Sequence, residues 1–312
     1  MPVVNPLPKI AIVGSGAIGL YYGAKLAPAG AEVRFLMRSD LVAVLARGSL
    51  LLHEKNARTE LRPVAAFGST EEIGPVDLVI VTLKTTANGE LARLLPPLLG
   101  PRTVILTLQN GLGSDEQIAA LFGAERVMGG LAFIAATRTA PGEVTCYHPG
   151  SIALGEFGRP PQERTRALAA QFEGAGVKTR VVDDLNEARW HKLVWNIPFN
   201  GLAIAAGGIA TNRLCAIPRL AEEVRALMHE VQFAAGRLGF AIPEKFLRQQ
   251  FDVTPPMGAY RPSSLVDFLA GREVEVEAIW GEPLRRAQAA GAKMPRLERL
   301  YASLKKLTLK AE

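Results

Sequence analysis

The strongest constraint on the fold is a glycine-rich turn that lies between an apolar strand and an apolar helix near the start of the chain. The run KIAIV at 9–13 is rich in β-branched residues, and LYYGAKLAPAG at 20–30 has the apolar spacing of a packed helix that ends at Gly30. GSGAIG lies between them. This order predicts a βα unit whose turn binds the diphosphate of a dinucleotide. The alternative is a glycine turn that closes a βα unit and binds no ligand.

Each glycine of this turn is expected to have a separate task. Gly14 permits the tight turn, Gly16 lets the backbone approach a pyrophosphate, and Gly19 lets the helix pack closely on the strand. The helix then offers N–H groups and a positive dipole end to the phosphates. The predicted cofactor-binding residues of the turn are Gly14, Ser15, Gly16, Ala17, Ile18 and Gly19.

The end of the next predicted strand, AEVRFLM at 31–37, indicates which dinucleotide binds. NAD-type sites place an acidic residue about 20 residues after the glycines, where it holds the ribose 2′-hydroxyl. Here Arg38 lies at that position, whereas Glu32 comes too early and Asp40 too late. A guanidinium can bind a 2′-phosphate through two hydrogen bonds. We therefore predict NADP(H), held by Arg38, and the alternative is a solvated surface arginine.

Two further buried strands end in polar side chains. VDLVIVTLK at 76–84 ends in Lys84, and RTVILTLQNG at 102–111 carries Asn110 near its end. Ligands of open α/β sheets bind beyond the carboxyl ends of the strands. We expect Lys84 and Asn110 to contact the cofactor, although residues in such places often only form turns.

The second half of the chain changes from alternating strands and helices to helices alone. Hairpin strands at 137–157 and a last strand at 177–182 end the first half. We predict an α/β, Rossmann-type dinucleotide-binding domain over 1–183 and an all-helical domain over 184–312, a division that suits a chain of 312 residues. The expected helices of the second domain span 184–206, 218–238, 244–251, 262–271, 273–290 and 296–309.

The composition fits a globular protein and limits its partners. The chain is 48% hydrophobic and 21% charged, and its net charge of +6 favours anionic partners. Its basic residues are scattered, which favours a phosphorylated cofactor over nucleic acid. We see no apolar run near the ~20 residues that span a membrane, no signal peptide and no metal-ligand spacing. With only Cys146 and Cys215, and no CxxC, we expect reduced thiols and a cytoplasmic protein.

Three polar residues fall on one face of an otherwise apolar helix, within WHKLVWNIPFN at 190–200. Lys192, Asn196 and Asn200 are four residues apart, and a step of four turns a helix by only about 40°. A buried amide must be hydrogen-bonded, and a buried ammonium must be paired or functional. The apolar neighbours therefore favour a functional site over a solvated face. Ser263 and Glu275 belong to a second polar group, in which Glu275 alone could simply complement a helix dipole.

Together these motifs resemble the ketopantoate reductase (2-dehydropantoate 2-reductase) family over nearly the whole chain. The matching motifs are GSGAIG, VTLK, QNG, Lys-x3-Asn-x3-Asn and the block SSLVDFLAGREVEVEAIWG. The resemblance implies a Rossmann domain followed by a helical domain, with the active site in the cleft between them. It also implies NADPH-dependent reduction of 2-ketopantoate to pantoate, a step of pantothenate synthesis.

The resemblance assigns roles to residues of this chain. Lys192 is expected to be the catalytic acid, since an ammonium with the reference pKa of about 10.4 is charged at pH 7 and can stabilise and protonate an oxyanion. Glu275 is expected in the catalytic site and beside the cofactor. The expected substrate-binding residues are Asn110, Asn196, Asn200 and Ser263.

Three positions depart from the family pattern and keep other functions open. Pro198 precedes Asn200 and is expected to kink the helix, Val274 replaces a usual Thr, and Trp280 replaces a common Asn. A reductase of another 2-keto acid therefore stays an alternative. A catalytically silent NADP-binding regulator is a third interpretation, against which the intact Lys192 and Glu275 argue. A homodimer also stays open.

Overall fold

The computed structural model describes residues 8–309, and the chain divides into two compact units. The first unit comprises the chain up to Gln109 together with Ser114–Leu185. The second comprises the short segment Asn110–Gly113 and the chain from Asn186 onward. The sequence led us to expect residues 110–113 in the first domain, so their membership of the second unit is a finding of the structure.

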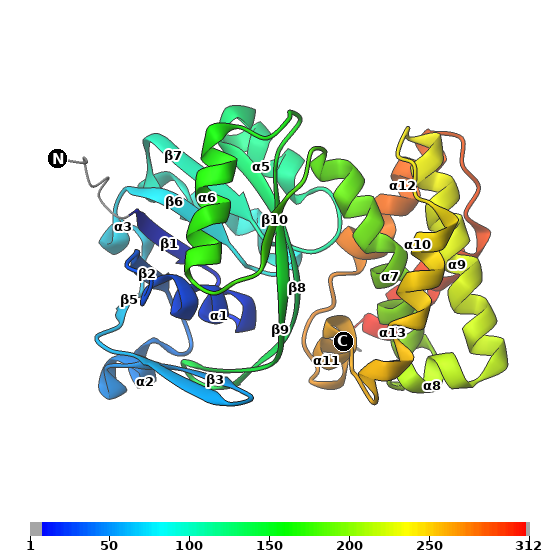
Figure 1. Ribbon diagram of the computed structural model, residues 1–312, viewed down its shortest axis with the longest axis horizontal. Helices are drawn as coiled ribbons and strands as arrows, with labels where there is room; N and C mark the ends of the chain where they lie inside the picture. Colours follow the sequence, from blue (N-terminus) through cyan, green and yellow to red (C-terminus); the bar gives the residue numbers. More distant parts are fainter. Residues whose placement is uncertain (1–7, 310–312) are drawn as a thin grey trace. The chain divides into compact units, whose positions relative to one another are not determined.

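The first unit contains a parallel sheet with the strand order of a Rossmann fold (Figure 1). Its six parallel strands, in spatial order, are β5 (Ala65–Phe67), β2 (Glu32–Leu36), β1 (Lys9–Val13), β6 (Val76–Val81), β7 (Leu99–Thr107) and β8 (Val127–Ala140). Alternate residues of β1 enter different cores: Ile10 and Ile12 pack in one, and Ala11 and Val13 in the other. Burial on both faces explains why this strand is apolar throughout. The predicted α/β class is confirmed.

The rest of the sheet is built on a long hairpin. β8 pairs antiparallel with β9 (Glu143–Glu156), so the hairpin is longer than the one expected at 137–157. β9 also pairs in parallel with β10 (Thr179–Val181) and β3 (Leu50–Glu54), and β3 pairs antiparallel with the outermost strand, β4 (Ala57–Leu61). The helices of this unit are α1 (Ala17–Leu26), α2 (Leu41–Arg47), α3 (Thr70–Ile73), α4 (Leu91–Leu94), α5 (Ser114–Phe122) and α6 (Glu163–Gly174).

The second unit is helical, as expected. Its helices are α7 (Leu185–Ala205), α8 (Thr211–Ala216), α9 (Pro218–Arg237), α10 (Glu244–Asp252), α11 (Ser263–Leu269), α12 (Glu282–Ala289) and α13 (Pro295–Thr308). One expectation was wrong, because the helix expected from 273 begins only at Val276. The sequence analysis did not predict α8. A π-helical turn, η5 (Glu277–Gly281), precedes α12. α7 continues as one helix through Pro198.

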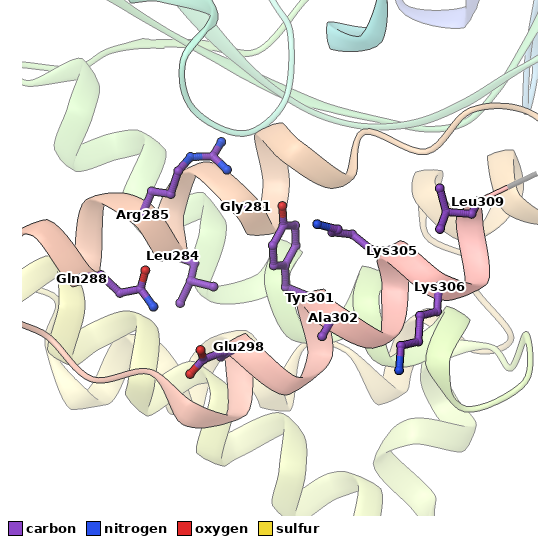
Figure 2. A pocket seen from close by; sticks show the side chains of 10 residues that line it. All are labelled: Gly281, Leu284, Arg285, Gln288, Glu298, Tyr301, Ala302, Lys305, Lys306 and Leu309. Carbon is purple, nitrogen blue, oxygen red and sulfur yellow. The ribbon is translucent and has the colours of Figure 1, made fainter.

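The second unit has one apolar core and a shallow groove. Trp190, Ile197, Trp280 and Leu297 are among the side chains of that core. A groove of about 470 Å³ lies on α12 and α13, and Figure 2 shows the side chains that line it. The residues that line it are Gly281, Leu284, Arg285, Gln288, Glu298, Tyr301, Ala302, Lys305, Lys306 and Leu309. None of the predicted site residues lines this groove, so the candidate site has to be built from other side chains.

Candidate active site

The three glycines of the turn have three different environments. Gly14 has a φ of 110°, and a Cβ there would lie 2.4 Å from the Leu83 nitrogen. At Gly19 a Cβ would lie 2.3 Å from the Gly14 carbonyl oxygen, so this glycine lets α1 pack on β1. Gly16 is exposed, and a Cβ there would meet no atom within 4 Å. Gly16 therefore presents open backbone, which fits a pyrophosphate that lies against it.

The N-terminus of α1 also suits an anion. Gly16 is its N-cap and provides no side-chain cap, and the first turn contains no acidic residue. Ala17 and Ile18 begin this helix, so their N–H groups lack partners within it. The Ser15 hydroxyl donates a hydrogen bond to the Leu36 carbonyl at 2.8 Å, which ties the turn to β2.

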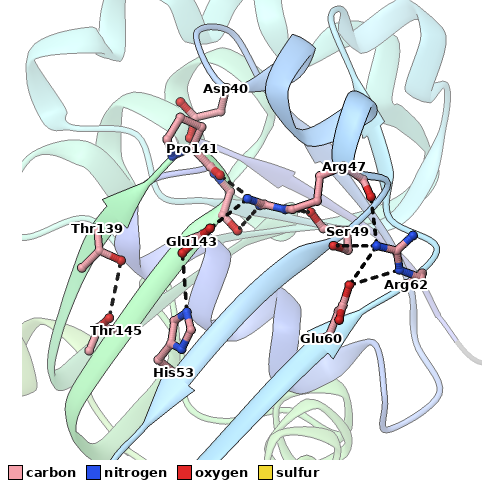
Figure 3. A network of polar contacts seen from close by, with 11 residues as sticks. Asp40, Arg47, Ser49, His53, Glu60, Arg62, Thr139, Pro141, Glu143 and Thr145 are labelled. Carbon is pink, nitrogen blue, oxygen red and sulfur yellow. Dashed lines mark hydrogen bonds and ion pairs between the residues drawn. The ribbon is translucent and has the colours of Figure 1, made fainter.

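After the end of β2, the basic residue Arg38 is exposed and the acidic residue Asp40 is buried. Asp40 is buried, and its carboxylate accepts hydrogen bonds from Arg138 and from the Gly142 N–H of the β8–β9 turn. Figure 3 shows Asp40 beside this turn. Burial acts to raise the pKa of Asp40, but these hydrogen bonds outweigh it and hold the pKa below its usual value. The Arg38 side chain is exposed and makes no hydrogen bond or ion pair with the described residues.

The ends of β6 and β7 are held together by a residue that the sequence analysis did not select. The Gln109 side chain is buried and donates to the Leu83 carbonyl at 2.9 Å and to the Asn88 side chain at 2.7 Å. Lys84 lies exposed at the start of the 3-10 helix that follows β6. Gln109 therefore supports the loop on which Lys84 lies. Its place beside Asn110 in the QNG motif was the only sequence signal.

In the second unit, Lys192 of α7 lies against Asn110. Its Nζ donates to the Asn110 Oδ1 at 2.9 Å. Burial lowers the pKa of Lys192 to about 7, repulsion from Arg189 adds to this, and the negative charge of Glu275 opposes it. The sequence led us to assume an ordinary lysine pKa, and that assumption was wrong because it ignored burial. Lys192 can therefore give up a proton near neutral pH.

The two asparagines of α7 have different surroundings. Asn200 is buried, and its Oδ1 accepts a hydrogen bond from the Ser264 N–H at 3.0 Å. This bond holds the first turn of α11, where Ser263 is exposed. Asn196 is 8% exposed, and its side chain makes no hydrogen bond to the described residues. Asn196 therefore has an amide to offer a ligand, whereas Asn200 already supports α11.

Two of the residues that depart from the family pattern belong to the packing. Trp280 is fully buried, and its Nε1 donates to the Ile197 carbonyl at 2.9 Å. Val274 is buried as well. Within residues 8–309 no group of three or more His, Cys, Asp or Glu could hold a metal ion. The same residues include no helix with the length and apolarity to cross a membrane.

Comparison with protein families decides the assignment. The model described as "Ketopantoate reductase PanE/ApbA" matches residues 10–159, and its C-terminal counterpart matches residues 184–308. The chain belongs to the ketopantoate reductase family. Members of this family are oxidoreductases that use a nicotinamide dinucleotide and act on a small keto acid, which agrees with the open glycine turn of the first unit.

Individual relatives agree with the family. The chain is 38% identical over 302 residues to a 2-dehydropantoate 2-reductase of Nostoc sp., a match that covers 95% of this chain and 94% of the relative. It resembles the crystal structure of the 2-dehydropantoate 2-reductase of Geobacter metallireducens GS-15, with a TM-score of 0.93, 45% identity and coverage of 96% and 99%. A D-mandelate dehydrogenase solved with NADH has a TM-score of 0.86, 22% identity and coverage of 96% and 98%, and shares the fold.

The different environments of two glycines generate a first prediction. Gly16→Ala should fold normally because its Cβ meets no atom, yet it should weaken nicotinamide dinucleotide binding at least about tenfold by obstructing the pyrophosphate. Gly19→Ala should instead lower the melting temperature, because its Cβ would collide with the Gly14 carbonyl. Calorimetric titration and thermal unfolding of both variants provide the measurement. Unchanged cofactor affinity in a folded Gly16→Ala enzyme would contradict the assignment of the turn.

Proposed function

We propose that this chain catalyses the NADPH-dependent reduction of 2-dehydropantoate (ketopantoate) to pantoate, a step towards pantothenate and coenzyme A. The observation that carries the proposal is the hydrogen bond between Lys192 and Asn110 beside Glu275, in a chain that belongs to the ketopantoate reductase family. We infer that the first unit binds the cofactor and the second supplies the acid and the substrate ligands. A cytoplasmic location agrees with the two free cysteines, and a homodimer stays a prediction.

Lys192 has the properties that the proposed reaction requires of an acid. When bound, the reduced nicotinamide supplies a hydride to the C2 carbonyl carbon of the keto acid. Negative charge then develops on the carbonyl oxygen, and a positioned cation stabilises that charge. The Lys192 ammonium donates its proton to this oxygen, and a pKa of about 7 suits transfer near neutral pH. Asn110 accepts one ammonium hydrogen and Glu275 attracts the charge, so both orient Lys192 for this transfer.

The neighbouring polar residues suit the rest of a 2-keto acid. Asn196 lies one turn along α7 from Lys192, and we propose that its amide binds the polar groups of the substrate. Ser263, exposed at the first turn of α11, donates to the substrate carboxylate. Asn200 fixes that turn through Ser264 and so acts on the substrate through Ser263.

The proposed cofactor ligands lie at the edge of the sheet in the first unit. The backbone of residues 14–19 would hold the pyrophosphate, Arg38 the 2′-phosphate, and Lys84 a further anionic group of the cofactor. Asn110 and Glu275, which belong to the second unit, are the other proposed cofactor ligands. Asp40 is committed to Arg138 and Gly142, so it leaves the position of the 2′-phosphate without an acidic side chain.

A panel of 2-keto acids tests the proposed substrate. Purified enzyme is assayed with ketopantoate, pyruvate, 2-ketoisovalerate and phenylglyoxylate, and NADPH oxidation is followed by absorbance. We expect ketopantoate to give the highest kcat/KM by at least about tenfold, since a missing hydroxyl leaves a buried polar group unpaired. A higher kcat/KM for another acid would mean that this acid is the substrate, while the proposed reaction, reduction of a 2-keto acid, would stand. Tight NADPH binding without turnover of any acid would contradict the proposal.

Arg38→Ala tests the choice of cofactor. Only NADPH carries the 2′-phosphate, so the variant should lose on the order of 1.5–3 kcal/mol of NADPH binding while NADH binding changes little. The measurement is kcat/KM with each cofactor. The matched control is Arg102→Ala, which removes an exposed arginine from the N-terminal half of β7. If Arg38→Ala keeps the parent's preference between the two cofactors, Arg38 does not contact the phosphate.

Lys192→Ala tests the acid. Loss of a positioned acid costs about 10²–10⁴-fold, so kcat should fall by that factor while NADPH affinity and the melting temperature stay near those of the parent. Because reduction needs the protonated lysine, kcat/KM of the parent should fall tenfold per pH unit above about 7. Lys293→Ala removes an exposed lysine of the same unit and should change neither quantity. A kcat loss below tenfold would make Lys192 a structural lysine.

A further inference from the structure

The π-helical turn in the second unit leaves one backbone carbonyl without a donor from its own helix. In an α-helix the Ala278 carbonyl would accept from the N–H of Glu282, but that N–H donates to the Glu277 carbonyl instead. In a π-helix the donor would be residue 283, which is a proline and has no N–H. Pro283 therefore keeps the Ala278 carbonyl open to a partner from elsewhere in the chain.

That partner is the segment Asn110–Gly113. The Leu112 N–H donates to the Ala278 carbonyl at 2.9 Å. Gly111 has a φ of 79°, and a Cβ there would lie only 2.2 Å from the same carbonyl oxygen. The docking thus requires glycine for both its conformation and its close approach. Arg189 of α7 adds a longer hydrogen bond of 3.5 Å to the Gly111 carbonyl.

The docked segment ends at the residue that holds the Lys192 ammonium. Asn110 directly precedes Gly111, and its Oδ1 accepts from the Lys192 Nζ at 2.9 Å. Glu275, whose charge acts on the same ammonium, lies at the other side of the turn, and its carbonyl accepts from the Ile279 N–H. One helical turn therefore holds the backbone of Glu275 and, through Leu112, the segment that begins with Asn110.

We propose that Pro283 and Gly111 are positioning residues for the reaction: Pro283 keeps the Ala278 carbonyl open, and Gly111 lets the segment dock on it, which holds Asn110 against Lys192. The kinetic consequences rest on the proposed function, whereas the effect on the ionisation of Lys192 does not. The charged groups that act on Lys192 are Arg189 of α7 and Glu275 before η5, and neither is altered by the variants below.

The first comparison is Gly111→Ala against Gly113→Ala. Both glycines have positive φ, 79° and 98°, so alanine strains the backbone at each. A Cβ at Gly113, however, would meet only the Glu282 Cγ, at an ordinary 3.7 Å. We expect kcat to fall at least about tenfold in Gly111→Ala and less than about threefold in Gly113→Ala, with similar NADPH affinity in both. Equal losses would mean that strain alone is responsible and would overturn the proposal.

The second comparison is Pro283→Ala against Pro218→Ala. Alanine at 283 supplies an N–H that competes with Leu112 for the Ala278 carbonyl, and losing one such hydrogen bond should lower kcat about three- to tenfold. Pro218 also begins a helix, α9, where the missing N–H has no helical acceptor, so its replacement should leave kcat unchanged. Equal kcat in the two variants would show that the open carbonyl has no effect on the reaction.

The decisive readout is the ionisation of Lys192, followed by NMR in protein labelled with ¹⁵N-lysine and assigned with Lys192→Ala. Losing the Asn110 oxygen removes an acceptor that favours the ammonium, so the pKa of Lys192 should fall in Gly111→Ala and Pro283→Ala but not in the two controls. An unchanged titration in Gly111→Ala would overturn the proposal. If the pKa of Lys192 shifts in Gly111→Ala while Lys192→Ala keeps full activity, the positioning roles of Gly111 and Pro283 stand. The proposal that Lys192 is the catalytic acid would then be wrong.

Discussion

The candidate site depends on the free energy required to hold the half-buried ammonium of Lys192 partly out of water. Burial of Lys192 disfavours its charge, and Arg189 on the same helix disfavours it further. The negative charge of Glu275 opposes both effects, and the Asn110 oxygen accepts a hydrogen bond from the ammonium. Neither is near Lys192 in the sequence. The fold therefore has to bring both to α7.

The need to place Asn110 beside Lys192 explains why segment Asn110–Gly113 belongs to the second unit, although the chain on both sides of it belongs to the first. Segment 110–113 follows the end of β7, where α/β sheets commonly place ligand contacts. Its peptide groups need partners once they leave the sheet, and the Ala278 carbonyl supplies one for Leu112. Pro283, which follows the π-turn in the first turn of α12, is thus connected through backbone contacts to the asparagine that contacts Lys192.

The sequence predicted the features that depend on local spacing and missed those that depend on distant partners. The glycine turn and the stripe from Lys192 to Asn200 were predictable because strand, turn and helix periodicities operate within a few residues. The contact of Asn200 with Ser264 joins residues 64 apart, and that of Asp40 with Arg138 joins residues 98 apart. Local patterns contain no information on such pairs. The lowered pKa of Lys192 was missed for the same reason, since burial is a property of the folded chain.

The departures from the family pattern also become interpretable once their partners are known. The Trp280 indole donates to the Ile197 carbonyl, and a Cβ at position 201 would lie 2.8 Å from that indole nitrogen. Gly201 and Trp280 therefore fit each other, and a side chain at position 201 would displace the ring. Because the contact lies in the apolar core of the second unit, a change at position 280 alters how α7 is supported and does not replace Lys192, Asn196 or Glu275. On physical grounds, Trp280 gives no reason to expect a different reaction.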